Sequence, residues 1–477
     1  MKTKHCHLAL FLILILISSC ENESNKNKGE NAPGTQTGNY GTDFPKDSVL
    51  EKIMCSSNPS VFYSLYLPPS YSTNKKFPVL FFFDAHGDAS LPLNKYKSVA
   101  SEHGYIFIGS GNSKNGLNLD ESLTIATTMM EDVMKNISVD ERRIYLAGFS
   151  GGARVAGYVA AKNVLVAGVI ACSAGIQTSG TAFPKSFSFA GIAGDEDANY
   201  QEMKSIQFDM KTVNISNIFF SFHGTHEWPP AETIKKAILW SDFQAMKNKV
   251  LPLNDSLITR MQNEYEQKIS AFIIENKIPE AYFQMNEELN FLDGLRDMTE
   301  LINQIASMQT SPPIKKELKE EETIFHEEDL KKQEYNAALL SQSISWWKRE
   351  ILKLKHVSTI DNKHNLLNKR LLGHLGLAVY SYSNNLLRSN QLEMVEKLLA
   401  VYQTLEPDNS EAYYLAAMLY ARQGKTDASI SFLNSAITKG FSDAERISSE
   451  PDFQNLKKDS RFISLTSKIK NFKLLNS

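Results

Sequence analysis

Residues 143–154 read RIYLAGFSGGAR, and this stretch decides the fold that the sequence predicts. Ile144 to Ala147 form an apolar run, as expected of a buried strand, and Ala153 begins a run of small residues typical of a helix. The five residues between them, GFSGG at 148–152, match the G-x-S-x-G elbow, in which a sharp turn exposes a serine between a strand and a helix. The pattern is short enough to arise by chance. Its strand–turn–helix context is what predicts that Ser150 is a nucleophile.

Strand-like runs recur on both sides of this motif, between about residue 48 and residue 250. They lie at 77–84, 105–109, 166–171, 187–193 and 218–222, and helical candidates at 119–136 and 152–161 separate some of them. Strands that are apolar on both faces and alternate with helices indicate a mostly parallel sheet. We therefore predict an α/β domain of the α/β-hydrolase type over residues 46–250, with its site at the carboxyl ends of the strands.

Length and composition limit the classes of function. A chain of 477 residues is long enough for two or three domains, and 42% hydrophobic with 22% charged residues is typical of a globular protein. The formal net charge of −3 provides no basic footprint for nucleic acid or anionic lipid. We expect no nucleic-acid partner, no cofactor and no metal.

The first 45 residues predict export and anchoring. Residues 1–19 combine basic residues with a short apolar run, which indicates a signal peptide, and the run ends in ISSC, similar to a bacterial lipobox with Cys20 as the lipidated residue. Acyl chains such as palmitate on Cys20 would hold the protein on a membrane of the cell envelope. Residues 20–45 are polar and predict a flexible tether. Outside the cytoplasm a Cys55–Cys172 disulfide is permitted, but the spacing does not require it.

After residue 250 the strand-like runs disappear, and stretches rich in Leu, Glu, Lys and Gln predict an all-α region. We divide it into helices at 251–375 and tetratricopeptide-like repeats at 376–470, with a generic helical bundle as the alternative to the repeats. Tyr413, Tyr420, Gly424 and Ala436 fall where that repeat has its aromatic, glycine and alanine positions. Such repeats bind protein partners, which suggests a partner for this region.

A serine nucleophile needs a histidine base, and in this fold the acid and then the histidine follow the serine along the chain. His223 and His226 lie just after the apolar run 218–222. His226 is the better candidate because it sits in the turn beyond the strand, and His223 is the alternative.

The acid is sought in the Gly194-Asp195-Glu196-Asp197 segment, which follows the run 187–193. Asp197 is far enough past the strand for its carboxylate to turn toward a histidine from the next loop. Asp195 stays an alternative that could instead cap the turn, and Glu196 is expected to face solvent.

The oxyanion of an acyl-transfer reaction needs two converging N–H donors. The first is expected to be the N–H of Gly151, directly after the serine. The second is expected in the loop after the run 77–84, where we choose the N–H of Asp88 and regard His86 as structural.

Three segments together resemble secreted esterases of the polyhydroxybutyrate depolymerase and feruloyl esterase group. They are DAHG at 84–87, RIYLAGFSGGAR at 143–154 and GTHEWP at 224–229. In that group the histidine of the third segment is the base and an aspartate in a Gly-x-x-Asp turn is the acid, which implies His226 and Asp197 here. The resemblance covers roughly residues 60–245.

These observations predict a membrane-anchored extracytoplasmic serine esterase that cleaves a carboxylic ester through an acyl-serine intermediate. The same residues also allow a peptidase or a thioesterase. An interaction scaffold with an inactive hydrolase domain is the alternative of a different class.

Overall fold

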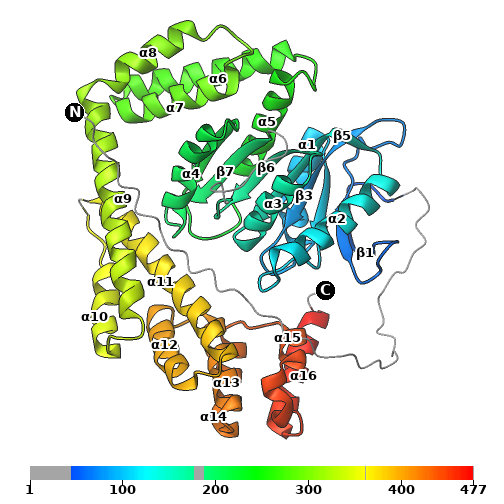
Figure 1. Ribbon diagram of the computed structural model, residues 1–477, viewed down its shortest axis with the longest axis vertical. Coiled ribbons are helices and arrows are strands. Elements are labelled where there is room, and N and C mark those ends of the chain that lie inside the picture. Colours follow the sequence, from blue (N-terminus) through cyan, green and yellow to red (C-terminus); the bar gives the residue numbers. More distant parts are fainter. Residues whose placement is uncertain (1–43, 177–186, 360, 476–477) are drawn as a thin grey trace. The chain divides into compact units, whose positions relative to one another are not determined.

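The strand–turn–helix unit around Ser150 lies at the centre of one large sheet in the computed structural model (Figure 1), which describes residues 44–176, 187–359 and 361–475. The predicted signal peptide, Cys20 and almost all of the tether lie outside the described residues. Eight strands form the sheet: β1 Val49–Met54, β2 Phe62–Tyr66, β3 Phe77–Phe83, β4 Ile106–Ser110, β5 Val139–Phe149, β6 Val166–Cys172, β7 Ser188–Gly194 and β8 Asn217–Phe222.

The strands follow the order β1-β2-β4-β3-β5-β6-β7-β8. From β4 to β8 all neighbours are parallel, whereas β1 and β2 pair antiparallel at one edge. This order and the helices on both faces give the α/β-hydrolase fold, which confirms the predicted fold class. The prediction omitted β1 and β2. β1 is a half-exposed edge strand, whereas β2 is mostly buried but short, and Ser64 interrupts its apolar run.

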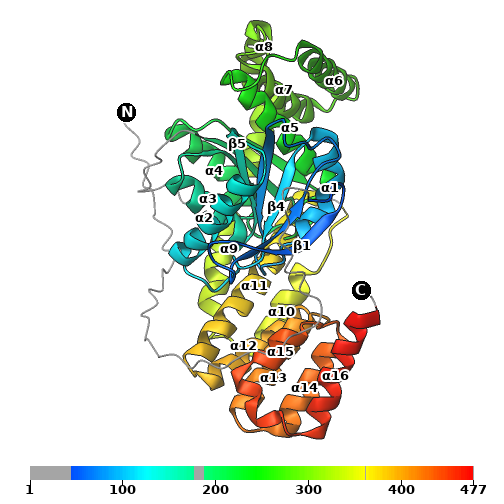
Figure 2. The same ribbon diagram turned by 90° about the vertical axis from the view of Figure 1, so that its right-hand side faces the viewer.

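Five helices cover the two faces of the sheet (Figures 1 and 2). They are α1 Leu91–His103, α2 Leu119–Asn136, α3 Gly151–Lys162, α4 Tyr200–Thr212 and α5 Ala231–Lys247. Side chains of α2, α3 and α4 enter one core cluster, and those of α1 and α5 enter another. Val133 and Val159 are fully buried in the first cluster, and Leu93 and Trp240 in the second. The two cores hold the sheet between them.

The rest of the described chain is helical, as the sequence predicts. Its elements are α6 Asp255–Ile274, α7 Ile278–Leu292, α8 Thr299–Gln309, α9 Pro312–Ala338, α10 Ile344–Leu354, α11 Asn362–Arg388, α12 Leu392–Leu405, α13 Ser410–Arg422, α14 Thr426–Thr438, α15 Ala444–Ser449, the 3₁₀ helix η1 Pro451–Leu456 and α16 Ser460–Leu475. The core of the α1 and α5 face continues into α6 and α7 through Ile258 and Phe291. A third core runs from Ile324 of α9 to Ile469 of α16. All these residues belong to one compact unit.

Two further observations concern predicted features. Cys55 and Cys172 are both buried and free, so no disulfide joins them. Within residues 44–176, 187–359 and 361–475, no helix has the length and apolarity needed to cross a membrane.

Candidate active site

The nucleophile elbow is built by close contact between the backbones of β5, β3 and α3. The backbone of Ser150 has φ 54° and ψ −119°, which lies outside the regions that residues other than glycine favour. A Cβ on Gly152 would lie 1.9 Å from the carbonyl oxygen of Phe83, and one on Gly148 would lie 2.2 Å from that of Gly152. Only glycine fits at either position. The amide of Ser150 donates to the carbonyl of Cys172 (2.9 Å), which ties the elbow to β6.

Ser150, His226 and Asp197 meet at the carboxyl ends of β5, β8 and β7. His226 Nε2 lies 2.9 Å from Ser150 Oγ, and His226 Nδ1 lies 3.0 Å from Asp197 Oδ1. A carboxylate only accepts hydrogen bonds, so Nδ1 carries the proton and donates to Asp197. Nε2 is then the acceptor for the Ser150 hydroxyl, the arrangement in which a histidine can remove the serine proton. We call these three residues the triad.

The two loops that carry the acid and the base touch through their glycines. A Cβ on Gly194 would lie 2.2 Å from the carbonyl oxygen of Gly224. Asp197 is fully buried, its N–H donates to the Gly194 carbonyl (3.1 Å), and its Oδ1 also accepts from the Asn199 N–H (2.8 Å). The buried carboxylate is thus held in one orientation toward His226.

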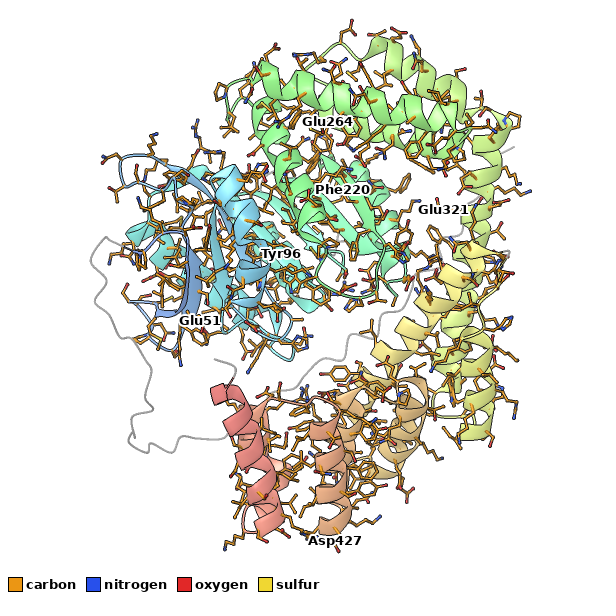
Figure 3. All side chains as sticks on the ribbon, turned by 180° about the vertical axis from the view of Figure 1, so that it is seen from behind. Glu51, Tyr96, Phe220, Glu264, Glu321 and Asp427 are labelled. Carbon is orange, nitrogen blue, oxygen red and sulfur yellow. The ribbon has the colours of Figure 1, made fainter. Side chains whose placement is uncertain are left out.

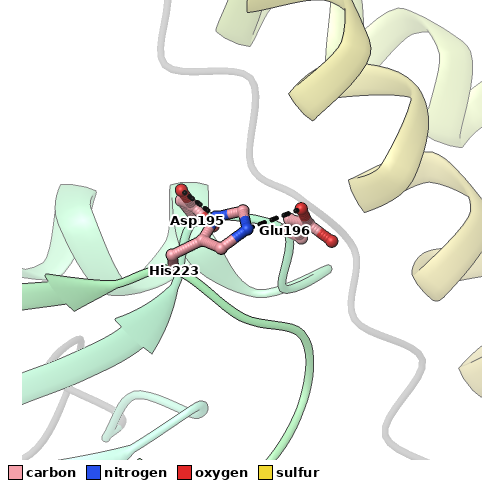
Figure 4. A group of neighbouring side chains, drawn as sticks. All are labelled: Asp195, Glu196 and His223. Atoms are coloured by element: carbon pink, nitrogen blue, oxygen red, sulfur yellow. Dashed lines mark hydrogen bonds and ion pairs between the residues drawn. The ribbon is translucent and has the colours of Figure 1, made fainter. Parts of the chain in front are cut away.

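The other carboxylates of this segment pair with groups outside the triad. Asp195 Oδ2 lies 3.2 Å from His223 Nδ1, and Asp195 Oδ1 accepts from the Gly224 N–H. Figure 4 shows His223 between Asp195 and Glu196. Asp195 and His223, the alternative acid and base, therefore pair with each other outside the triad. Glu196 does not face solvent as expected, because Lys369 of α11 binds it and its side chain is 10% exposed.

Donor atoms of Asp195, Glu196 and His223 lie within 4.8 Å of one another, a spacing that would suit a metal ion. The ammonium group of Lys369 already binds Glu196, however, and His223 is exposed. Lys369 therefore supplies the positive charge that this acidic group needs.

The base loop is fixed by Trp228 and its neighbours. Trp228 Nε1 donates to Asp84 Oδ2 (2.8 Å), and Tyr96, labelled in Figure 3, donates its hydroxyl to the Pro229 carbonyl (2.7 Å). Phe149 lies between the rings of His226 and Trp228, with centroids at 4.9 and 5.5 Å. The Asp84–Trp228 contact could not be predicted from the sequence, because the two residues are 144 positions apart.

The loop after β3 differs from the expectation for the oxyanion donor. Asp84 Oδ1 accepts from the N–H of His86 (2.7 Å) and from that of Asp88 (3.4 Å). The Asp88 N–H is thus directed back to Asp84 and is not free for an oxyanion. The reason is that buried Asp84 needs donors: burial opposes its ionisation, but hydrogen bonds from His86 and Trp228 outweigh this and lower its pKa. The bond to Asp84 raises the pKa of His86, consistent with a structural role for that residue.

Gly151 begins α3, where the first amide groups have no partner within the helix. Its position directly after Ser150 suits a donor to an oxyanion. Asn115, which sequence analysis missed, lies against it: a Cβ on Gly151 would lie 1.8 Å from Asn115 Oδ1. An Asn-Gly pair in the loop after β4 was the only signal in the sequence, and it indicates a turn rather than a site.

Comparison with known proteins found similar solved structures over part of the chain. No protein-family model and no curated protein matches it. Among solved structures, the S-formylglutathione hydrolase FrmB of Staphylococcus aureus is 14% identical over 41% of this chain and 98% of its own, with a TM-score of 0.33. For esterase B of Lactobacillus rhamnosis, inhibited by a tributyrin phosphonate, the identity is 16%, the coverage 43% and 90%, and the TM-score 0.35. For esterase 2 of Thermogutta terrifontis, phosphonylated by sarin, these values are 11%, 43% and 96%, and 0.34.

The class of protein follows from the geometry of the chain itself. The sheet order, the strained serine between β5 and α3, and the hydrogen-bonded triad together define a serine hydrolase with the α/β-hydrolase fold.

Proposed function

We propose that this protein is a serine esterase that hydrolyses a carboxylic ester through an acyl-Ser150 intermediate. One observation carries the proposal: the continuous chain of hydrogen bonds from Ser150 Oγ through His226 to the buried Asp197. A scaffold with an inactive hydrolase domain would not need these three side chains to be hydrogen-bonded to one another.

The geometry supports a two-step mechanism. As Ser150 Oγ attacks the ester carbonyl, its proton passes to His226 Nε2, and Asp197 stabilises the imidazolium through Nδ1–H. The tetrahedral oxyanion accepts a hydrogen bond from the Gly151 N–H at the start of α3. His226 then gives its proton to the departing alcohol. A water molecule, deprotonated by the same nitrogen, then attacks the acyl carbonyl. As the bond between the acyl carbon and Ser150 Oγ breaks, His226 returns the proton to Oγ and the acid is released.

The resemblance to polyhydroxybutyrate depolymerases and feruloyl esterases supplies candidate acyl groups but does not define the substrate. An ester panel with acetyl, feruloyl and hydroxyalkanoyl groups would define it, and matched amide and thioester substrates would reveal the peptidase or thioesterase alternatives. We expect oxygen esters to be cleaved fastest. A faster amide or thioester reaction would replace the esterase proposal with one of those activities.

The nucleophile is tested by Ser150→Ala. Turnover of short-chain nitrophenyl esters should fall by a factor of about 10⁴ or more, while the midpoint of thermal unfolding stays close to that of the wild type. Full activity in this variant would rule out Ser150 as the nucleophile.

The base is tested with a fluorophosphonate probe, which should label the wild type. His226→Ala should block labelling, whereas the matched control His223→Ala should label as the wild type does. The opposite result would make His223 the base, and no labelling of the wild type would favour the scaffold.

Localisation and partners are proposed from the sequence. Export and lipidation of Cys20 would place the esterase on the outer side of a bacterial membrane, with residues 20–45 as a tether and the helices of 376–470 available to a protein partner. Cys20→Ser should then move the protein from the membrane fraction to the soluble fraction. Continued membrane association of that variant would contradict lipidation.

A further inference from the structure

A buried group of charges joins α9 to α11. Glu328 of α9 is fully buried, and Arg370 of α11 is 3% exposed. Glu328 forms ion pairs with Lys332, one turn later on α9, and with Arg370, both at 2.7 Å. Charges removed from water in this way are costly unless their remaining hydrogen-bonding groups find partners. The two cations, Lys332 and Arg370, have such further partners.

Both cations also donate to backbone carbonyls of the turn that carries the triad acid. Arg370 Nη1 donates to the Asp195 carbonyl (3.2 Å), and Lys332 Nζ donates to the Ala198 carbonyl (2.8 Å). These carbonyls lie on either side of Asp197 in the sequence. We call the three residues Glu328, Lys332 and Arg370 the clamp.

Further contacts place α11 directly on this turn. A Cβ on Gly373 would lie 3.6 Å from Ala198 Cβ, so that a side chain there would touch the turn. The guanidinium carbon of Arg370 lies 5.4 Å from the ring centre of Tyr200, the first residue of α4. Glu321 of α9, labelled in Figure 3, pairs with Lys204 on the same helix α4.

The clamp complements the bonds that the sheet supplies to the turn. The amides of Asp195 and Glu196 donate to carbonyls of Phe222 and Gly224, the segment that leads to His226. Those bonds hold the amide groups of the turn, and the clamp holds carbonyls at its two ends. Together these bonds restrain the backbone on both sides of Asp197.

We propose that Arg370 and Lys332, organised by Glu328, are positioning residues that keep Asp197 aligned with His226, so that α9 and α11 complete the esterase site. The inference rests on the proposed function. None of the three has a hydrogen bond or ion pair with the nucleophile Ser150. They act through the turn at 195–198, and displacing a catalytic group by about 1 Å can lower a rate 10²-fold.

Kinetics of the full-length protein test the clamp. Arg370→Met should lower kcat for 4-nitrophenyl butyrate about 10- to 100-fold, with KM unchanged within about twofold. Lys332→Gln leaves the buried Arg370–Glu328 pair intact and should give a smaller loss. The matched control is Lys363→Ala, because Lys363 of α11 pairs with Glu317 and Glu320 of α9 without contacting the turn. This control should keep the wild-type kcat.

A double-mutant cycle distinguishes positioning from general damage to the fold. If the clamp acts through Asp197, then Arg370→Met should cost nothing further in an Asp197→Asn background. Equal losses of kcat in both backgrounds would overturn the proposal, and so would an unchanged kcat in both Arg370→Met and Lys332→Gln.

Amide hydrogen exchange supplies a readout that needs no turnover. Peptides that span residues 195–200 should exchange faster in Arg370→Met and in Lys332→Gln than in the wild type, and at the wild-type rate in Lys363→Ala. Unchanged exchange in the first two variants would overturn the clamp. The esterase proposal would instead be refuted by a wild-type protein that cleaves no ester and does not react with the fluorophosphonate probe. The exchange measurements do not require esterase activity, so the two proposals can fail separately.

Discussion

Ser150 carries a backbone conformation that costs a non-glycine residue on the order of 1–3 kcal/mol. The neighbouring glycines allow α3 to lie against β3 and β5 closely enough to hold that conformation. The strain directs Oγ toward His226 without a rearrangement at the moment of reaction. The tight turn is therefore as necessary for the nucleophile as the serine hydroxyl itself, because the turn orients Oγ.

Asp197→Asn should lower kcat by about 10³- to 10⁴-fold with little change in KM, because an amide can no longer fix the Nδ1–H tautomer of His226. Steady-state kinetics on 4-nitrophenyl butyrate measure this, and Asp195→Asn is the matched control. A larger loss in Asp195→Asn than in Asp197→Asn would exchange the roles of the two carboxylates.

Glu288 of α7 should make stability depend on pH. Burial and the nearby Glu266 raise its pKa to about 7 from an ordinary 4.5. The folded protein then binds more protons than the unfolded chain between these values, so stability falls as pH rises from 4.5 to 7. Glu288→Gln should stabilise the protein at pH 8 by about 1–3 kcal/mol and have little effect at pH 4.5.

Thermal unfolding at the two pH values measures this effect of Glu288, with the exposed Glu280→Gln as control. An equal shift of the unfolding midpoint at both pH values would show that folding does not raise the pKa of Glu288.

At the scale of elements, Gly152→Ala should disrupt the elbow. Its Cβ would lie 1.9 Å from a backbone carbonyl of β3, so the sheet and α3 must separate. We expect the unfolding midpoint to fall by several degrees and the esterase rate to drop at least 100-fold, as expected of a displaced nucleophile. Gly373→Ala is the contrast. Its Cβ would make only an ordinary contact with Ala198 at 3.6 Å, and alanine favours the helical conformation of α11. It should be neutral or stabilising by differential scanning fluorimetry.

Six of the eight strands and the helices α2 and α3 could be predicted because each is marked by a local pattern. The run predicted at 119–136 matches α2, and the Asn118 capping box explains its sharp beginning. The candidate residues Ser150, Asp197 and His226 were reachable for the same reason, since each follows a strand at a fixed offset. No local sequence pattern predicts the hydrogen bond between Asp84 and Trp228, which joins two distant loops. Nor does one predict that the Asp88 N–H donates to Asp84.

At the scale of the whole molecule, α11 contacts two loops at the carboxyl edge of the sheet. Near its start Arg370 bonds to the turn at 195–198, and near its end Arg388 lies where a side chain on Gly116 would meet it at 3.5 Å. The sequence pattern predicted a hydrolase part and a separate helical part, divided at residue 250. It could not reveal the contact between Arg370 and Asp195, because periodicity reports local structure and these residues are 175 positions apart. The boundary at 250 and the tetratricopeptide resemblance stay predictions.

If the clamp joins the helical part to the active site, the helices and the esterase activity should be lost at the same denaturant concentration. In urea, the loss of esterase rate and the loss of helical circular dichroism should share one midpoint in the wild type and in Lys363→Ala. In Arg370→Met the rate should disappear at a lower urea concentration than the helical signal, because the turn at 195–198 loosens before the helices unfold. Coincident midpoints in Arg370→Met would mean that the sheet alone holds Asp197. Separate midpoints in the wild type would mean that the helical part folds and unfolds without the hydrolase.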